Sequence, residues 1–370
     1  MPSAIVVGAG VFGASLAHRL ALRGWEVTLV DRHSPGHVLA ASGGESRILR
    51  FSHGEERWYA RSALRARELW RELEAATKAE LFIPVGVVWL VRGGGELEER
   101  SSWVLQEEGL PVERLAPAAA AELFPSLEQR DLRYALLEPE AGILRAREAV
   151  RCLVREAEKH GARLLAGTAE PVGAAVRVGR DSLRADRVVW ACGAWLPHLF
   201  PGLVDIRVTK QDVFFFGGTS EWQTPPVPVW VDTAAGIYGV GDLDGRGVKA
   251  ADDREGPPLD PERDPRLADP KGEQTVRAYL ETRFPSLRGS PLVGTRTCAY
   301  ALTPDSNFIV APHPDHDGVW ILGGGSGHGF KHGPALGEYV ADLLEEREAR
   351  DARFGLEPRP SGPSLRAATD

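Results

Sequence analysis

The sequence predicts an α/β fold, in which a mainly parallel sheet is joined to a second domain built on an antiparallel sheet. Three observations support this prediction. The chain opens with an apolar run, a glycine-rich turn at residues 8–13, a helical pattern and a second apolar run ending at Asp31. The largely apolar run at residues 185–195 is typical of a strand buried in a parallel sheet. Short runs separated by glycines between residues 207 and 250 are typical of antiparallel strands.

The glycine-rich turn has the sequence GAGVFG and lies between a strand and a helix. Gly8 permits the tight turn, Gly10 lets the backbone approach a pyrophosphate, and Gly13 lets the helix pack on the strand. The phosphates would lie at the helix N-terminus, where free N–H groups and the helix dipole favour anions. Asp31 would accept hydrogen bonds from a ribose diol. These features predict a Rossmann-type unit, and they do not distinguish NAD from FAD.

The remaining elements follow from the hydrophobic period and from turn residues. Helices are predicted at residues 59–76, 101–108, 117–123, 147–160 and 273–284, and from Pro334 onward. Strands are predicted at residues 82–90, 161–166, 207–216, 227–231, 236–240, 245–250, 308–310 and 319–322, and a strand-turn segment is predicted at residues 136–144. Residues 33–46 and 256–270 are predicted as loops, and the polar chain from Ser361 as disordered.

The strand at residues 185–195 is expected to return to the sheet formed by the first strands, which makes the nucleotide-binding domain discontinuous in sequence. We expect that domain to comprise residues 1–80, 140–205 and 295–350. The substrate-binding domain would then comprise residues 81–139 and 206–294, and residues 351–370 would form a C-terminal tail.

The formal net charge of −8 and the pI of about 5.8 argue against nucleic acid or an anionic membrane as a general partner. Three scattered cysteines are too few for a disulfide framework or a zinc site, so we expect no metal. The sequence shows no apolar run that would span a bilayer and no signal-peptide pattern. A cytoplasmic protein is therefore expected.

A second glycine-rich segment, GGGSGHGFK at residues 323–331, lies between a strand and the helix predicted near Pro334. Glycine lets a backbone lie flat against a ring or an anion. A helix start suits the negative charge that a reduced flavin carries. The two ends of the chain are therefore expected to share one cofactor.

With these motifs the chain resembles the D-amino-acid-oxidase-type flavoproteins, and among them the monomeric sarcosine oxidase and N-methyltryptophan oxidase family. The resemblance covers nearly the whole length. Besides the glycine motif with Asp31, the matching segments are GESRILR at 44–50, WACGAW at 190–195, GRGVK at 245–249, RTCAY at 296–300 and GSGHGFK at 325–331. The resemblance implies FAD as cofactor, a small amino-acid substrate, O2 as electron acceptor and a monomeric protein.

The resemblance also implies that Cys298 tethers the flavin through its 8α-methyl, with Arg296 favouring the reactive thiolate. The structural alternative is a small buried cysteine. The other cofactor-binding residues that we expect are Gly8, Gly10, Gly13, Asp31, Arg32, Ser42, Ser46, Arg47, Gly193, Trp195, Gly325, Gly327, His328, Gly329 and Lys331.

Arg50 and Lys331 match family positions that bind the substrate carboxylate, and a fixed cationic pair is suited to that task in an apolar pocket. Lys249 matches a lysine over the flavin, where its ammonium would stabilise superoxide as oxygen is reduced. Arg47 matches a basic residue near the flavin ring, and Tyr300 would line the substrate site. We therefore predict catalytic roles for Lys249, Arg47 and Tyr300. An exposed strand lysine and a core aromatic residue are the structural alternatives for Lys249 and Tyr300.

The chain departs from the family pattern at two places. Asp253 stands four residues after Lys249, where the sarcosine oxidases carry a histidine. Ser42 and Gly43 stand where those enzymes tend to have histidines. If this register holds, the resemblance implies a pocket that has lost an imidazole and gained a carboxylate, which leaves the substrate side chain open.

The predicted function is FAD-dependent oxidation of sarcosine or another secondary or N-alkyl amino acid to an imine, with O2 reduced to H2O2. The imine would hydrolyse to an amine and an aldehyde. Three alternatives remain open. They are a D-amino-acid or cyclic imino-acid oxidase acting on proline or pipecolate, an amine dehydrogenase with another electron acceptor, and an NAD-binding scaffold without a redox role.

Overall fold

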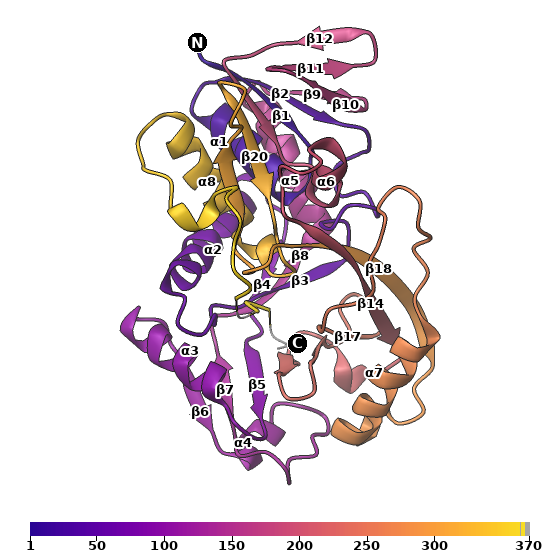
Figure 1. Ribbon diagram of the computed structural model, residues 1–370. Coiled ribbons are helices and arrows are strands. Elements are labelled where there is room, and N and C mark those ends of the chain that lie inside the picture. The colour runs from indigo at the N-terminus through magenta and orange to yellow at the C-terminus, as the bar shows by residue number, and fades with distance from the viewer. Residues whose placement is uncertain (363, 367–370) are drawn as a thin grey trace.

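The computed structural model describes residues 1–362 and 364–366, and its strands form two main sheets that lie in the upper and lower halves of Figure 1. The upper sheet has six strands in the order β19-β20-β13-β1-β2-β9. Its parallel strands are β1 (Ser3–Val7), β2 (Glu26–Asp31), β9 (Arg163–Ala166), β13 (Arg187–Trp190) and β20 (Val319–Gly323), with the antiparallel strand β19 (Ile309–Pro312) at one edge. Three distant segments of the chain therefore build one sheet, as expected for the nucleotide-binding unit.

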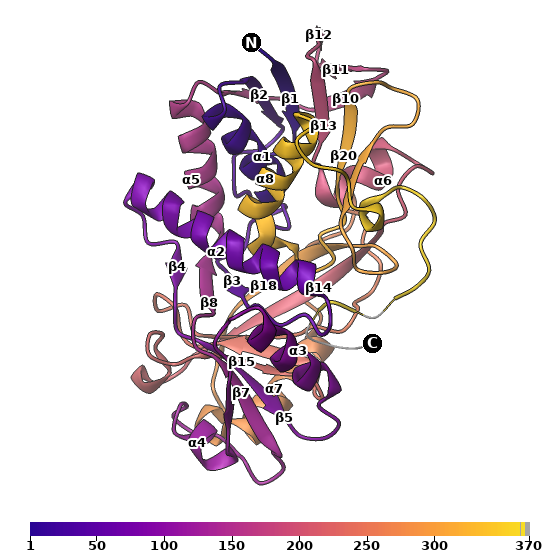
Figure 2. The ribbon, with the colours of Figure 1, turned by 90° about the vertical axis from the view of Figure 1, so that its left-hand side faces the viewer.

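Both faces of this sheet are covered, which explains why its strands are apolar on both sides. Helices α1 (Val11–Leu22), α5 (Ala146–Lys159) and α8 (Gly333–Leu344) pack on one face, and α2 (Arg57–Thr77) packs against α8 (Figure 2). The other face is covered by α6 (Leu196–Leu199) and by a small sheet that the sequence patterns did not indicate. That sheet consists of β10 (Ala169–Val172), β11 (Ala175–Val178) and β12 (Asp181–Leu183).

The lower sheet has eight strands in the order β18-β14-β17-β16-β15-β5-β7-β6. These are β5 (Val87–Val91), β6 (Glu113–Leu115), β7 (Tyr134–Glu138), β14 (Arg207–Phe216), β15 (Val229–Asp232), β16 (Ile237–Val240), β17 (Val248–Asp252) and β18 (Leu292–Leu302). All neighbouring pairs are antiparallel except β5 and β15, which confirms the predicted antiparallel sheet with one parallel exception. The remaining elements are a three-stranded sheet of β3 (Ser46–Leu49), β8 (Gly142–Arg145) and β4 (Phe82–Ile83), and helices α3 (Glu96–Glu107), α4 (Pro117–Ala121) and α7 (Pro270–Arg283).

Side-chain alternation in the lower sheet decides which residues face the upper half of the molecule. Phe214 and Phe216 pack in one core cluster with residues of α7, whereas Phe215 between them packs in a different cluster. Strand β17 pairs with β14, and its successive side chains also point alternately to the two faces of the sheet. Val248 lies in the α7 cluster, so the next residue, Lys249, points to the other face of the sheet.

Two sequence-based expectations need correction. The strand predicted at residues 82–90 is divided into β4 and β5, because Pro84 has no N–H to donate and Gly86 adopts a positive φ of 79°. The chain after Ser361 is not a loose polar tail in the part that the structure describes. Leu365 and Arg366 are only 7% and 4% exposed. The carbonyl oxygen of Leu365 accepts a hydrogen bond from Arg50, and the side chain of Arg366 donates one to the carbonyl oxygen of Asp253. Within the described chain, no helix is both long enough and apolar enough to cross a membrane.

Candidate active site

A cavity of about 270 Å³ lies at the carboxyl ends of the parallel strands, where ligands bind in open α/β sheets. Its walls come from both ends of the chain, including the glycine-rich turn, residues 191–195 and residues 323–327. Among the expected cofactor-binding residues it is lined by Gly8, Gly10, Asp31, Arg32, Ser42, Arg47, Gly193, Trp195, Gly325, Gly327 and Gly329. The structure therefore brings most of the predicted cofactor set together.

The three motif glycines have different surroundings. Gly8 has a φ of +102°, and a Cβ on it would lie 2.5 Å from the carbonyl oxygen of Ala191. A Cβ on Gly13 would lie 1.9 Å from the carbonyl oxygen of Gly8. At Gly10 the nearest atom would be the Ser42 hydroxyl at 3.5 Å. The fold itself requires glycine at positions 8 and 13, whereas Gly10 leaves space that a ligand can fill.

This difference predicts that two alanine substitutions act on different properties, one on protein stability and the other on FAD retention. Gly13→Ala forces backbone atoms apart and should destabilise the flavin-free protein by about 1–3 kcal/mol, as overpacking does. Gly10→Ala should leave the melting temperature of the flavin-free protein unchanged and weaken FAD retention. Both are measured by thermal unfolding and flavin absorbance of protein expressed under riboflavin limitation. Equal melting temperatures for the two variants would contradict the assignment.

The carboxylate of Asp31 is held in place by backbone donors. The N–H groups of Ala9 and His33 donate to Oδ2 and Oδ1 at 2.6 and 2.8 Å. Each carboxylate oxygen keeps a second acceptor site. Because Asp31 also lines the cavity, its remaining lone pairs are available to a diol.

A second cavity of about 60 Å³ adjoins the first, and four residues line both of them: Arg47, Tyr300, Gly327 and Phe330. Its other walls include the predicted residues Arg50, Lys249, His328 and Lys331, together with Asp253, Tyr238 and Arg366. All predicted catalytic and substrate-binding residues thus meet here. His328, expected beside the cofactor, lies on this side instead of on the larger cavity.

Arg50 and Lys331 are buried basic side chains of the small cavity, with exposed fractions of 6% and 2%, and Lys249 and Arg366 in its walls are similarly buried. Arg50 donates to the carbonyl oxygens of Ser52 and Leu365, the second at 2.7 Å. The ammonium of Lys331 donates to the carbonyl of His328 at 3.1 Å. Burial and the charge of Arg50 lower the pKa of Lys331 well below its usual range. A carboxylate entering this cavity would restore the charged form of Lys331.

Glu138 is a site residue that sequence reasoning missed. It is fully buried and accepts hydrogen bonds of 2.6 Å from the Phe51 N–H, the Ser52 hydroxyl and the Trp89 indole. It therefore fixes the segment that follows Arg50. An acid at the end of the apolar strand β7 was the signal that could have revealed it.

Lys249 is buried beside β3. Its ammonium donates to the carbonyl oxygen of Ser46 at 3.0 Å and to the Ser46 hydroxyl at 3.3 Å. Burial, with a further contribution from Arg47, lowers the pKa of Lys249 to about 7. Ser46, expected to bind the cofactor, lines neither cavity and instead positions this lysine.

Cys298 lies on β18 and shares a strand face with Tyr300 two residues later. The guanidinium of Arg47 lies 3.7 Å from its sulfur, whereas Arg296 is ion-paired with Glu45 at 2.8 Å. Arg47 therefore supplies the cation that we expected from Arg296. The Cys298 side chain does not itself line either cavity, although Ala299 and Tyr300 do.

Tyr238 and Arg366 also line the small cavity, and the sequence analysis did not predict either of them as a site residue. Burial raises the pKa of Tyr238 and of Tyr300, so both phenols stay protonated and can donate hydrogen bonds. Arg366 donates to the carbonyl oxygen of Asp253 at 2.6 Å. It belongs to a segment that we expected to be disordered.

Comparison with known proteins extends this picture. The family described as FAD dependent oxidoreductase matches residues 3–343. The chain is 31% identical to a monomeric sarcosine oxidase of Bacillus sp. (strain B-0618) over 355 residues, covering 92% of this chain and 91% of the relative. It is 28% identical to an N-methyl-L-tryptophan oxidase of Citrobacter koseri over 367 residues, covering 96% of both chains.

Two solved structures share the fold at low identity. A crystal structure of L-proline dehydrogenase from P. horikoshii superposes with a TM-score of 0.85, covering 96% of both chains at 23% identity. The fructosyl amine:oxygen oxidoreductase Amadoriase I from Aspergillus fumigatus superposes with a TM-score of 0.80, covering 96% of this chain and 90% of the other at 22% identity. The chain therefore shares its overall fold with these two proteins.

Proposed function

The chain belongs to the FAD dependent oxidoreductase family, and from this premise we propose that it oxidises the C–N bond of a small secondary amino acid and reduces O2 to H2O2. The observation that carries the proposal is the pair of buried cations, Arg50 and Lys331, in a small cavity that shares walls with the larger one. A cationic pair of this kind is suited to a carboxylate next to the reacting amine.

The residues of the larger cavity fit FAD. Gly10 leaves room for a phosphate at the start of α1, and the oriented Asp31 suits the ribose diol. Residues 323–327 would lie against the flavin ring. When bound, FAD supplies the two-electron acceptor for the C–H bond next to the substrate nitrogen.

The residues of the small cavity would bind and orient the substrate. Arg50 and Lys331 hold the carboxylate, and their positive charges disfavour the protonated amine, so the nitrogen keeps its lone pair. The phenols of Tyr238 and Tyr300 can donate hydrogen bonds to the bound substrate. The imine that is formed hydrolyses in water to an amine and an aldehyde, which is formaldehyde for an N-methyl substrate.

Lys249 would act on the oxygen side of the reaction. It is a buried cation with only the Ser46 oxygens as hydrogen-bond acceptors within the described residues. A fixed ammonium in a water-poor site stabilises the negative charge that develops on oxygen as it is reduced. The pKa of about 7 means that this charge is present below neutral pH and lost above it.

A substrate panel tests this function. Purified enzyme is assayed for H2O2 with sarcosine, N-methyl-L-alanine, N-methyl-L-tryptophan, L-proline, L-pipecolate and D-alanine. Because the small cavity measures about 60 Å³, we expect the highest kcat/KM with sarcosine and at least about tenfold less with N-methyl-L-tryptophan. Preference for proline, pipecolate or D-alanine would assign a different amino-acid oxidase, and dye reduction without H2O2 would assign a dehydrogenase.

Covalent flavin attachment through Cys298 gives a further prediction. Acid precipitation of the native protein should leave the yellow colour in the pellet, and Cys298→Ser should release all of it to the supernatant, because only a covalent bond survives unfolding. Cys192→Ser is the matched control, since Cys192 lines the larger cavity but burial raises its thiol pKa and disfavours the nucleophilic thiolate. Colour in the supernatant of the native protein would exclude the tether.

A further inference from the structure

Three histidines gather behind the small cavity, from two parts of the chain. His53 follows β3, His328 precedes the short 3-10 helix η4 (Gly329–His332), and His332 ends it. Their exposed fractions are 4%, 5% and 0%. One ring nitrogen of each lies within 4.8 Å of one ring nitrogen of each of the others, and the ring centroids are 5.2, 5.8 and 5.9 Å apart.

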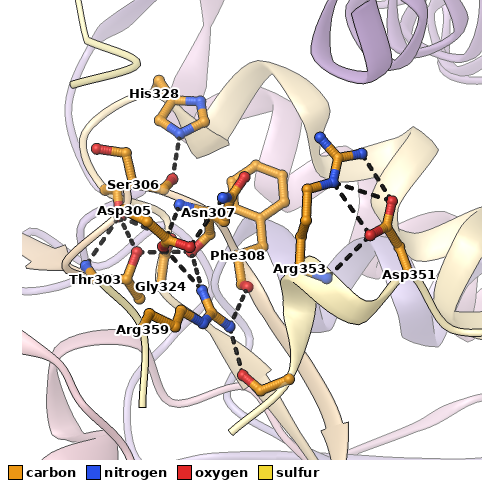
Figure 3. A network of polar contacts seen from close by, with 12 residues as sticks. Thr303, Asp305, Ser306, Asn307, Phe308, Gly324, His328, Asp351, Arg353 and Arg359 are labelled. Carbon is orange, nitrogen blue, oxygen red and sulfur yellow. Dashed lines mark hydrogen bonds and ion pairs between the residues drawn. The ribbon is translucent and has the colours of Figure 1, made fainter. Parts of the chain in front are cut away.

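The hydrogen bonds of His53 and His328 fix where the protons of these two rings are. Nδ1 of His53 lies 2.9 Å from the carbonyl oxygen of Phe51, and Nε2 of His328 lies 2.9 Å from that of Ser306 (Figure 3). A carbonyl oxygen only accepts, so both of these nitrogens carry a proton. The other nitrogen of a neutral imidazole is then a lone-pair acceptor, and in His53 and His328 it has no partner within the described chain.

The third ring, His332, has a different kind of partner. Its Nδ1 lies 3.1 Å from the Ser62 hydroxyl, which can donate or accept, so this contact does not fix the tautomer. Its Nε2 has no partner among the residues that the structure describes. Three buried ring nitrogens thus face no protein partner, two of them fixed as lone-pair acceptors, and a bound cation would satisfy them.

We propose that His53, His328 and His332 bind one Zn²⁺ ion through the ring nitrogens that lack a protein partner. Three neutral imidazoles with one open position form a common zinc ligand set. Tetrahedral Zn–N bonds of about 2.0–2.1 Å place ring centroids roughly 5 Å apart, close to the spacing seen here. The second ring nitrogen of His53 and of His328 donates to a backbone carbonyl, as the outer shell of a metal site requires.

The carbonyls around His328 are held firmly. The two residues that follow Ser306 are Asn307 and Phe308, and Figure 3 shows Arg359 donating to the backbone oxygens of both. These hydrogen bonds are 3.0 and 2.9 Å long. The ammonium of Lys331 donates to the carbonyl of His328 itself.

The test measures zinc on the flavin-containing enzyme and does not depend on activity. Protein incubated with excess ZnCl2 and desalted should retain about one Zn per chain by elemental analysis. His332→Phe, which replaces one ring by another of similar size, should retain below about a tenth of that. The control is the double variant His313→Ala with His316→Ala, a stacked histidine pair with a centroid distance of 4.5 Å elsewhere on the protein.

A second readout covers the case in which His332→Phe does not fold. Zinc should raise the melting temperature of the native enzyme in a concentration-dependent way, and a chelator should reverse the shift. Zinc retained equally by His332→Phe and the native protein would overturn the proposal. So would a native protein that retains none and shows no thermal shift.

Discussion

Replacing Lys249 by Met is expected to slow reoxidation of the reduced enzyme by O2 by roughly 10²- to 10³-fold, the loss typical of removing one preorganised charge donor. Reduction of the enzyme by substrate should change little, because Lys249 is bonded to Ser46 and not to Arg50 or Lys331. Stopped-flow absorbance separates the two half-reactions. Methionine keeps the side-chain length, so the burial of this position is preserved.

The same lysine predicts the sign of the pH dependence. Its pKa is lowered to about 7, so the ammonium is present below this pH and is lost as the pH rises through it. Reoxidation of the native enzyme should therefore slow between pH 6 and pH 9, by roughly the fraction of lysine that is deprotonated. Lys249→Arg keeps its charge over this range and should show no such slope. Reoxidation that is fast and equally pH-dependent in Lys249→Met would remove the lysine from the mechanism.

The second large effect is expected from Arg50 and Lys331, the two basic side chains proposed to bind the substrate carboxylate. Lys331→Met and Arg50→Met should each lower kcat/KM for the amino-acid substrate by about 10²- to 10³-fold. Each variant removes one partner of a buried charge pair with the substrate carboxylate, and such a truncation costs about 2–5 kcal/mol of binding free energy. The change should fall mainly on KM and on reduction of the enzyme. A simple carboxylate such as acetate should inhibit the native enzyme competitively and lose its effect in Lys331→Met.

Arg254→Met is the matched control for these variants. Arg254 follows Asp253, which lines the small cavity, but its guanidinium is half exposed and ion-paired with Asp252 at 2.7 Å. Its removal should leave kcat/KM within about twofold, as for most exposed pairs. Arg50 also bonds to backbone carbonyls, so flavin absorbance and thermal unfolding must be compared with the native enzyme. A normal kcat/KM in Lys331→Met would refute carboxylate capture at this lysine.

Much of the nucleotide-binding half was predictable from local pattern. The turn from Gly8 to Gly13 and the acid at Asp31 are signals confined to a few neighbouring residues, and the structure places them at one cavity. Lys249 and Lys331 were found through family motifs. Strand alternation in β17 then explains why Lys249 rather than Val248 reaches the site.

The residues that were missed depend on contacts between distant segments. Glu138 holds the backbone of Phe51, 87 positions earlier in the chain. Arg366 reaches the carbonyl of Asp253 across 113 positions. His53 and His332 lie outside every recognised motif, and only the packed structure brings them together with His328. No local period encodes such pairings, because they arise when separate elements pack.

The upper sheet also limits when flavin can be captured during biosynthesis. The central strand β1 needs β13 beside it, β13 needs β20, and the larger cavity takes its walls from Gly8 through Phe330. At a translation rate of about 5–20 residues per second, the first motif leaves the ribosome roughly 15–60 s before the last wall of the site. A nascent chain can therefore display the glycine turn long before it can hold FAD. Flavin uptake is therefore expected to follow release of a nearly complete polypeptide.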